Sequence, residues 1–156
     1  MTRILLVDDS EDVRRSVRAV LAGAVADPEI GEAGDAAGAL AALARERWDV
    51  VLLDLSLPDR SGLQALRDIR RLYPALPVIV MSFYAEAEYA AAARAAGAVG
   101  YVAKGSAAAV IAAAVRGALR PAEDARRPPP ATESAGGGIT PPASMIAGAG
   151  GPRCGK

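Results

Sequence analysis

The sequence of 156 residues contains no histidine and only one cysteine, Cys154. The lack of histidine excludes Ser-His-Asp and Cys-His catalysis and histidine-ligated metal sites, and any phosphoryl group must be carried on another residue type. A single cysteine cannot form an intramolecular disulfide, which is typical of proteins from a reducing, cytoplasmic compartment. The formal net charge is zero, so the composition gives no general attraction to nucleic acid or to a membrane surface.

The sequence also lacks a long hydrophobic run. The first apolar stretch, residues 4–7, is followed at once by Asp8 and Asp9, which does not fit a secretory signal. The alanine-rich segment 106–115 is far shorter than a membrane span. Hydrophobic residues nevertheless make up 52% of the chain, which is enough for an ordinary core. We therefore expect a globular protein of the cytoplasm with no membrane partner.

Short apolar segments alternate with segments of helical periodicity over residues 1–120. Segments of strand length lie at 3–8, 29–34, 49–54, 77–82 and 99–103. Segments with apolar residues at helical spacing lie at 10–24, 35–47, 61–72, 86–96 and 106–119. Five strands that alternate with five helices predict an α/β fold, a doubly wound parallel sheet with helices on both faces.

Residues 121–156 differ in composition from the rest of the chain. They contain seven prolines and seven glycines, and they show no periodicity long enough to bury one face of a helix or strand. We expect these residues to be a disordered Pro/Gly/Ala-rich tail that follows one domain of residues 1–120.

One buried apolar strand ends in a carboxylate, Asp54. The residue marks either the exit of the chain into solvent or a site that uses the charge, because an unpaired buried charge is costly. Other predicted strands lead to polar residues in the same way: Asp8 and Asp9, Ser82, and Lys104. Sites in open parallel sheets lie at the carboxyl ends of the strands. We expect these five residues to converge there, although each alone has an ordinary explanation as a cap, a turn residue or a solvated charge.

This set of residues suits phosphoryl chemistry. Three neighbouring carboxylates repel one another unless a cation neutralises them, and oxygen ligands suit Mg²⁺. The backbone carbonyl of Ser56 is placed to supply a further ligand. A metal-bound carboxylate at Asp54 can attack phosphorus and form an acyl phosphate. Lys104 and Ser82 would then neutralise and hydrogen-bond to the phosphoryl oxygens.

The motifs that contain these residues resemble the receiver domain of two-component response regulators, over about residues 2–120. They are VDDS at 7–10, LLDLSLP at 52–58 with Gly62, VIVMS at 78–82, and AGAVGYVAK at 96–104. The sequence most resembles the NarL/FixJ-type group of this CheY-like family. The resemblance implies a flavodoxin-like (βα)5 fold with the strand order 2-1-3-4-5.

The resemblance also implies the roles of the acidic residues and the partners. Asp54 is the phosphoacceptor, and Mg²⁺ is held by Asp8, Asp9, Asp54 and the backbone carbonyl of Ser56. The phosphodonor is a histidine kinase or a histidine phosphotransfer protein. The signal passes through the face formed by the fourth helix, fifth strand and fifth helix, to a downstream protein or a second copy of the chain. The protein is then a phosphorelay component and not an enzyme, apart from self-phosphorylation and autodephosphorylation.

Three further residues have roles by the same resemblance. Ser82 and Lys104 contact the phosphoryl group, and Ser82 is also the switch residue. Tyr101 matches the aromatic switch position, whose ring moves inward when the Ser or Thr engages the phosphoryl group. From its place two residues after Ser82, we expect bulky Tyr84 either to slow loss of the phosphoryl group to water or merely to cover its loop.

The chain departs from the pattern in two places, and two alternatives stay open. Gly105 follows Lys104 where many receivers have proline, so either isomer of this peptide is open. Residues 121–156 cannot supply the helix-turn-helix domain that NarL/FixJ-type regulators normally carry, so we expect no direct DNA binding. One alternative is a vestigial or truncated receiver that acts as an interaction module. The other, an aspartate-nucleophile phosphohydrolase, is disfavoured because Ser56 stands where such enzymes usually carry a second Asp.

Overall fold

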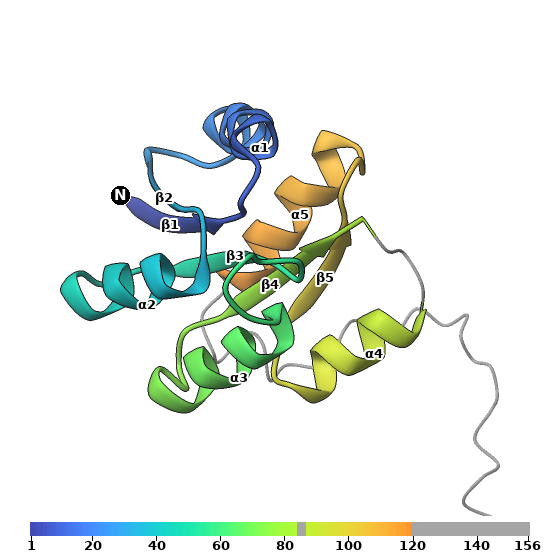
Figure 1. Ribbon diagram of the computed structural model, residues 1–156. Helices are drawn as coiled ribbons and strands as arrows, with labels where there is room; N and C mark the ends of the chain where they lie inside the picture. The colour runs from blue at the N-terminus through green and yellow to red at the C-terminus, as the bar shows by residue number, and fades with distance from the viewer. Residues whose placement is uncertain (84–86, 120–156) are drawn as a thin grey trace, which may run out of the picture. The chain divides into compact units, whose positions relative to one another are not determined.

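The computed structural model describes residues 1–83 and 87–119 of the chain, in which five strands alternate with five helices (Figure 1). The strands are β1 (Thr2–Val7), β2 (Pro28–Ala33), β3 (Val50–Asp54), β4 (Val78–Ser82) and β5 (Gly100–Ala103). The helices are α1 (Glu11–Ala24), α2 (Ala36–Arg45), α3 (Gly62–Leu72), α4 (Ala87–Ala95) and α5 (Ala108–Ala118). None of these helices has both the length and the apolar character needed to cross a membrane. The expected tail and Tyr84 lie outside the described residues, so the statements about them stay predictions.

The five strands form one parallel sheet in the order β2-β1-β3-β4-β5. Val7 of β1 pairs with Leu53 of β3, and Asp54 pairs with Met81 of β4. The chain first moves outward from β1 to β2 and then returns to place β3 on the other side of β1. The order therefore reverses between β1 and β3, and the carboxyl ends of these strands flank the reversal point. The predicted strand order 2-1-3-4-5 is confirmed.

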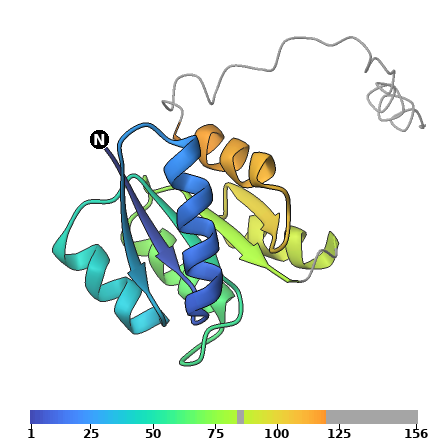
Figure 2. The ribbon, with the colours of Figure 1, turned by 90° about the horizontal axis from the view of Figure 1, so that it is seen from above.

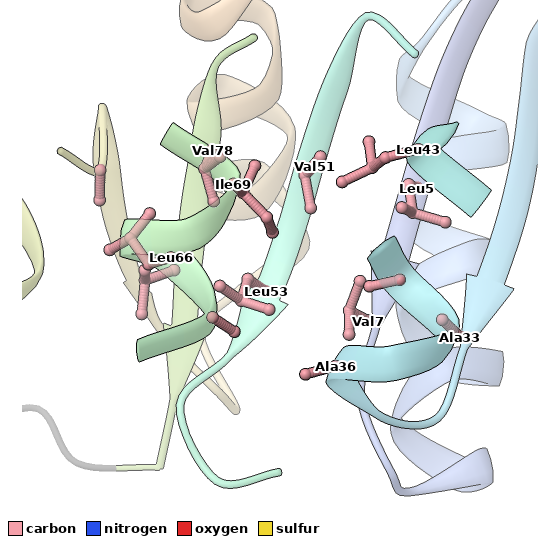
Figure 3. Packing of buried hydrophobic residues seen from close by; sticks show 14 of the residues in the cluster. Leu5, Val7, Ala33, Ala36, Leu43, Val51, Leu53, Leu66, Ile69 and Val78 are labelled. Atoms are coloured by element: carbon pink, nitrogen blue, oxygen red, sulfur yellow. The ribbon is translucent and has the colours of Figure 1, made fainter. Parts of the chain in front are cut away.

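Helices cover both faces of this sheet. α1 and α5 lie on one face, and α2, α3 and α4 lie on the other (Figures 1 and 2). Successive residues of β3 alternate between the two sides, because strand side chains have a period of two. Val50 and Leu52 pack in the cluster that α1 and α5 cover, whereas Val51 and Leu53 pack against α2 and α3 (Figure 3). Every residue of β3 and β4 is buried, as the apolar runs predict.

Local side-chain hydrogen bonds decide where the helices begin. The hydroxyl of Ser10 caps α1 by accepting a hydrogen bond from the backbone N–H of Val13 at 3.3 Å. At the start of α5, the Ser106 hydroxyl instead donates to the carbonyl of Ala103 at 2.6 Å. Because Ser106 stabilises this turn and does not cap the helix, α5 begins at Ala108, two residues later than the sequence predicts.

Trp48 packs at the amino-terminal edge of the sheet, at the end opposite the predicted site. Its ring is half-buried against the core, and its indole N–H donates to the carbonyl of Ala42 at 3.1 Å. The guanidinium of Arg3 lies over the same ring, 4.9 Å from its centroid. Trp48 thus packs against the core at the end of the sheet away from the site.

Candidate functional site

Three carboxylates meet at the carboxyl edge of the sheet. Asp8 directly follows β1, and Asp54 ends β3, which is the neighbouring strand. Each of Asp8, Asp9 and Asp54 offers an oxygen atom that lies within 4.8 Å of those of the other two. Asp8 and Asp54 are buried, whereas Asp9 is exposed. The reversal of strand order between β1 and β3 therefore brings these acidic residues together.

Lys104, which follows β5, places its ammonium group between the two buried carboxylates. Its Nζ atom lies 2.6 Å from Oδ2 of Asp8 and 3.1 Å from Oδ2 of Asp54. Only 6% of the Lys104 side chain is exposed, so the ion pairs are shielded from water. The ring of Phe83 adds to this shielding, with its centroid 4.7 Å from Nζ. Sequence reasoning did not single out Phe83.

The environment of Asp54 disfavours its charge. Burial raises the pKa of the Asp54 carboxyl, and the negative charge of Asp8 raises it further. The backbone N–H of Ser56 and the ammonium of Lys104 act in the opposite direction, but they do not cancel the effect of burial. A second cation at this edge would complete the neutralisation of the carboxylates.

The buried carboxylates keep oxygen atoms available for such a cation. The backbone N–H of Ser10 donates to Oδ1 of Asp8 at 2.8 Å, and that of Ser56 donates to Oδ1 of Asp54 at 3.1 Å. Among the described residues, the Oδ2 atoms of Asp8 and Asp54 are buried and accept no well-directed hydrogen bond beyond the contact with Lys104. An all-oxygen donor set of this kind fits a hard divalent cation.

Ser82 lies on β4, which is beside β3, and Tyr101 lies on β5, the next strand along the sheet. Ser82 ends β4 and is buried, and its carbonyl accepts a hydrogen bond from the backbone N–H of Lys104 at 2.6 Å. Tyr101 lies opposite Val80 in the register of β4 with β5, and it is partly buried against the cluster that α2, α3 and α4 cover. Ser82 follows Val80 by two residues, so Ser82 and Tyr101 share one face of the sheet.

The loop after β5 has an unusual backbone. The peptide between Lys104 and Gly105 is trans, which settles the isomer that the sequence left open. Gly105 has a φ of +92°, a conformation that favours glycine over every residue with a β-carbon. The glycine in the place of the familiar proline therefore gives the chain a sharp turn immediately after Lys104.

An apolar pocket of about 300 Å³ adjoins the site. It lies between α1 and the start of α5, and it reaches the edge of the site at Phe83, Lys104 and Gly105. Its apolar lining comes from both helices and from the strands between them: Val13, Val17, Val20, Met81, Val102 and Ile111.

Comparison with known proteins identifies the family. Residues 4–116 match the response regulator receiver domain. The chain belongs to this family. Among curated relatives, the DNA-binding transcriptional activator DevR/DosR of Mycobacterium tuberculosis is 41% identical over 107 residues, which are 67% of this chain and 48% of that protein. The response regulator UvrY of Escherichia coli K12 is 35% identical over 116 residues, or 74% of this chain and 53% of that protein.

Solved structures give the same assignment. A CheY-like receiver domain protein from Methanospirillum hungatei is 28% identical, with a TM-score of 0.68 over 76% of this chain and 94% of that one. The receiver domain of NtrX from Brucella abortus is 31% identical, with a TM-score of 0.68 over 74% of this chain and 97% of that one. The receiver is the part shared with longer proteins, because the chain spans about half the length of DevR/DosR and UvrY. Receiver domains typically bind Mg²⁺ at an acidic pocket, and such an acidic cluster is present here.

Two long-range contacts could not be found from the sequence. The guanidinium of Arg14 donates to the backbone carbonyl of Asp8, and the carboxylate of Asp59 accepts hydrogen bonds from the backbone at the start of α2. Arg14 is one of two adjacent arginines on a polar helix face, and Asp59 lies in an ordinary turn sequence. Neither position has a motif that indicates a partner so far away in the chain.

Proposed function

We propose that this chain is a phosphorelay receiver that accepts a phosphoryl group on Asp54 from a histidine kinase or a histidine phosphotransfer protein. The observation that carries the proposal is the position of Asp54, a buried carboxylate within reach of both Lys104 and two further carboxylates. Receiver chemistry needs a nucleophilic carboxylate, a fixed cation and a metal site at one place, and the pattern of these residues fits that need.

In the proposed reaction, an oxygen of the Asp54 carboxylate forms a bond to phosphorus. The bond from phosphorus to the donor nitrogen breaks, and the nitrogen keeps the electron pair. Lys104 stabilises the negative charge on the phosphoryl oxygens, and the Ser82 hydroxyl donates a hydrogen bond to one of them. Asp8, Asp9, Asp54 and the backbone carbonyl of Ser56 would hold Mg²⁺, which would neutralise the remaining negative charge.

The signalling step in this proposal begins at Ser82. A phosphoryl group on Asp54 draws the Ser82 hydroxyl toward it, and Tyr101 on the same face of the sheet follows. The face formed by α4, β5 and α5 then binds a downstream protein or a second copy. Three large hydrophobic residues exposed in or beside these elements support a docking role for this face: Tyr89, Val99 and Val110.

The apolar pocket beside the site supports docking of a protein phosphodonor. A donor must hold its phosphohistidine in line with Asp54, which requires a binding surface next to the site. The pocket between α1 and α5 is such a surface, and its edge is formed by Phe83 and Lys104. We propose that a helix of the donor binds there with its apolar face.

The proposal also concerns whether the chain is an enzyme. One relative, a protein-glutamate methylesterase/protein-glutamine glutaminase of Agrobacterium fabrum, is 45% identical over 85 residues, which are 53% of this chain and 23% of that protein. Receivers thus also occur within enzymes, and for this chain we propose a regulator that is not an enzyme. The domain boundary near residue 120, the absence of direct DNA binding and the cytoplasmic location stay predictions.

The experiment that tests the function is intact-protein mass spectrometry after incubation with acetyl phosphate and Mg²⁺. We expect wild type to gain one phosphoryl group, which hydroxylamine removes and which chelation of Mg²⁺ prevents. Asp54→Asn should gain none, whereas the control Asp27→Asn, whose side chain is 81% exposed, should behave like wild type. A folded wild type that gains no phosphoryl group from acetyl phosphate or from a phosphotransfer protein would support the vestigial interaction module.

A further inference from the structure

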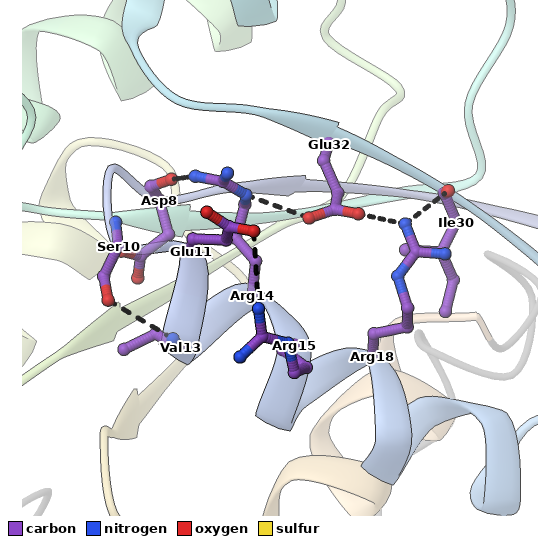
Figure 4. Close-up of polar contacts among 9 residues, drawn as sticks. All are labelled: Asp8, Ser10, Glu11, Val13, Arg14, Arg15, Arg18, Ile30 and Glu32. Carbon is purple, nitrogen blue, oxygen red and sulfur yellow. Dashed lines mark hydrogen bonds and ion pairs between the residues drawn. The ribbon is translucent and has the colours of Figure 1, made fainter.

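Residues 8–10 form the loop between β1 and α1, the acidic loop. It carries two of the three clustered carboxylates, Asp8 and Asp9, and Arg14 holds its backbone (Figure 4). The Nη1 atom of Arg14 donates to the carbonyl oxygen of Asp8 at 2.5 Å. The Nε atom of the same guanidinium donates to Oε1 of Glu32 on β2 at 2.9 Å. A single side chain therefore joins the acidic loop to the edge strand of the sheet.

The contact with Arg14 is made where the sheet ends. Val7 is the last residue of β1 that is paired with β2 and β3, and the N–H of Asp8 still donates to the carbonyl of Ala33 at 3.0 Å. The carbonyl of Asp8 lies beyond these pairs and takes its hydrogen bond from Arg14. That carbonyl and the N–H of Asp9 belong to one rigid peptide plane. Fixing the carbonyl of Asp8 therefore fixes the direction in which the chain enters Asp9.

Glu32 holds the guanidinium of Arg14 in place before any ligand binds. Its carboxylate accepts from Arg14 through one oxygen and from Arg18 through the other (Figure 4). Burial opposes the ionisation of Glu32, but the hydrogen bonds and charges of the two arginines outweigh it and lower its pKa. Glu32 is therefore ionised at neutral pH. The Arg14 side chain is only 19% exposed, so it has little freedom to adopt another rotamer.

We infer that Arg14 is a positioning residue for the acidic cluster, which sets the direction of the Asp9 carboxylate through the peptide that joins Asp8 to Asp9. The inference rests on the proposed function, because its consequence is the affinity of this cluster for Mg²⁺. Asp9 depends most on such positioning, since it is the exposed member of the cluster. Residues that orient metal ligands in this indirect way typically change metal affinity about 10- to 100-fold when they are replaced.

Charge and positioning predict opposite effects for the loss of Arg14. Arg14 carries a positive charge close to the acidic loop, and a positive charge repels Mg²⁺. If the charge alone mattered, Arg14→Ala would bind Mg²⁺ more tightly than wild type. If Arg14 positions the loop, the same variant binds more weakly. The sign of the change in affinity therefore separates the two explanations.

The test is a titration of the full chain with Mg²⁺ by isothermal titration calorimetry, for wild type, Arg14→Ala, Arg14→Lys and Arg18→Ala. Arg18→Ala is the matched control, because Arg18 also lies on α1 and also contacts Glu32 but makes no contact with Asp8. Arg14→Lys keeps the charge but cannot hold Asp8 and Glu32 with one rigid planar group. Thermal unfolding without Mg²⁺ shows whether each variant is folded.

We expect Arg14→Ala to weaken Mg²⁺ binding by about tenfold or more. Arg14→Lys should also weaken it, while Arg18→Ala should stay within about twofold of wild type. Unchanged or tighter binding by folded Arg14 variants overturns the inference and leaves the proposed function intact. An equal loss in Arg18→Ala also overturns it, because the effect would then belong to the whole ion-pair cluster. A wild type that binds no Mg²⁺ overturns both the inference and the metal site of the proposed function.

Discussion

The ammonium of Lys104 lies 2.6 Å from Oδ2 of Asp8, although one residue follows the last strand and the other follows the first. The contact crosses the middle of the sheet, and the same Nζ atom reaches Asp54 at 3.1 Å. Because all three side chains are almost fully buried, Lys104 is the resident counter-ion of the carboxylates. The stability of the fold and the chemistry of the site therefore depend on the same charge.

Replacing Lys104 with methionine should destabilise the protein strongly. The substitution keeps most of the side-chain volume but leaves Asp8 and Asp54 as uncompensated buried carboxylates, which typically costs about 3–5 kcal/mol in the free energy of unfolding. Urea denaturation at pH 7 measures this loss. Added Mg²⁺ should restore part of the stability, and a drop in pH should also reduce the difference from wild type. Equal stability of the two proteins at pH 7 without Mg²⁺ would contradict the role of Lys104 as counter-ion.

The raised pKa of Asp54 predicts how stability depends on pH. The folded protein holds the proton of this carboxyl more tightly than the unfolded chain, whose carboxyl has a pKa of about 3.9. The resulting stabilisation is fully present below the unfolded pKa and is lost as the pH rises through the raised folded pKa. Asparagine does not ionise, so Asp54→Asn does not lose stability as the pH rises. We therefore expect the variant to be more stable than wild type at pH 7 without Mg²⁺. Urea denaturation from pH 4 to pH 8 should show the advantage shrinking toward the acidic end.

The close backbone contacts of Gly62 predict that Gly62→Ala and Gly23→Ala change the free energy of unfolding in opposite directions. A β-carbon at Gly62 would lie 2.3 Å from Cα of Leu55 and 2.6 Å from the carbonyl oxygen of Asp54, and these backbone atoms cannot move without shifting the loop after β3. We expect Gly62→Ala to cost about 1–3 kcal/mol of unfolding free energy. It should also slow phosphorylation of Asp54.

The matched control for this substitution is Gly23→Ala in α1, where an added β-carbon meets nothing within 4 Å. Alanine forms helices better than glycine, so this variant should gain about 0.5–1 kcal/mol. Chemical denaturation of both variants checks the pair. A neutral Gly62→Ala would show that the loop after β3 adapts more easily than its contacts indicate.

The fold could be predicted from the sequence because local signals repeat along the chain. The apolar runs of β3 and β4 indicate strands buried on both faces, and the polar residue at the end of each strand indicates the edge where sites lie. Asp8, Asp54 and Lys104 could be grouped for that reason. The start of α5 could not be predicted correctly, because a serine at this place can either cap the helix or stabilise the turn before it, and here its hydroxyl donates to the carbonyl of Ala103.

Contacts between distant segments could not be predicted from the sequence, for a different reason. Arg14 could equally face solvent or a neighbouring carboxylate, and only the packing of α1 beside β2 brings it to Glu32 and to the carbonyl of Asp8. Phe83 also has no periodic pattern, since it follows the last residue of β4. Its place over Lys104 depends on how the loops after two strands meet.

The hydrogen bonds of Asp59 predict how the stability of the protein depends on pH. Its two carboxylate oxygens accept hydrogen bonds from the backbone N–H groups of Ala36 and Ala37, each at 2.9 Å, so a residue of the loop after β3 caps α2. These hydrogen bonds lower the pKa of the Asp59 carboxyl. The stabilisation is therefore present above the ordinary carboxyl pKa and is lost as the pH falls through the lowered folded pKa.

We expect Asp59→Ala to lower the melting temperature at pH 7 by roughly 3–8 °C, with a smaller decrease in strongly acidic solution. Asp12→Ala is the control, because Asp12 and its ion-pair partner Arg15 are both exposed and such a pair contributes little. Thermal unfolding followed by circular dichroism measures both variants. An effect of Asp59→Ala that is independent of pH down to the acidic limit would show that lost packing, and not the charged cap, is responsible.

Phe83 predicts how small phosphodonors reach Asp54. The side chain is 71% exposed, yet its ring lies 4.7 Å from Nζ of Lys104 and forms the edge of the apolar pocket. Asp54 itself is only 2% exposed, and Phe83 lies over the Lys104 ammonium that contacts it, so Phe83 is one of the side chains that can limit access to Asp54. We expect Phe83→Ala to increase the rate of phosphorylation by acetyl phosphate several-fold, with Phe83→Leu intermediate, as measured by the time course of intact mass. Leu72→Ala, which removes another exposed apolar side chain at the end of α3, should leave the rate unchanged. A lower rate in Phe83→Ala would instead show that the ring holds Lys104 in its productive position, because the cation–π contact would then matter more than access.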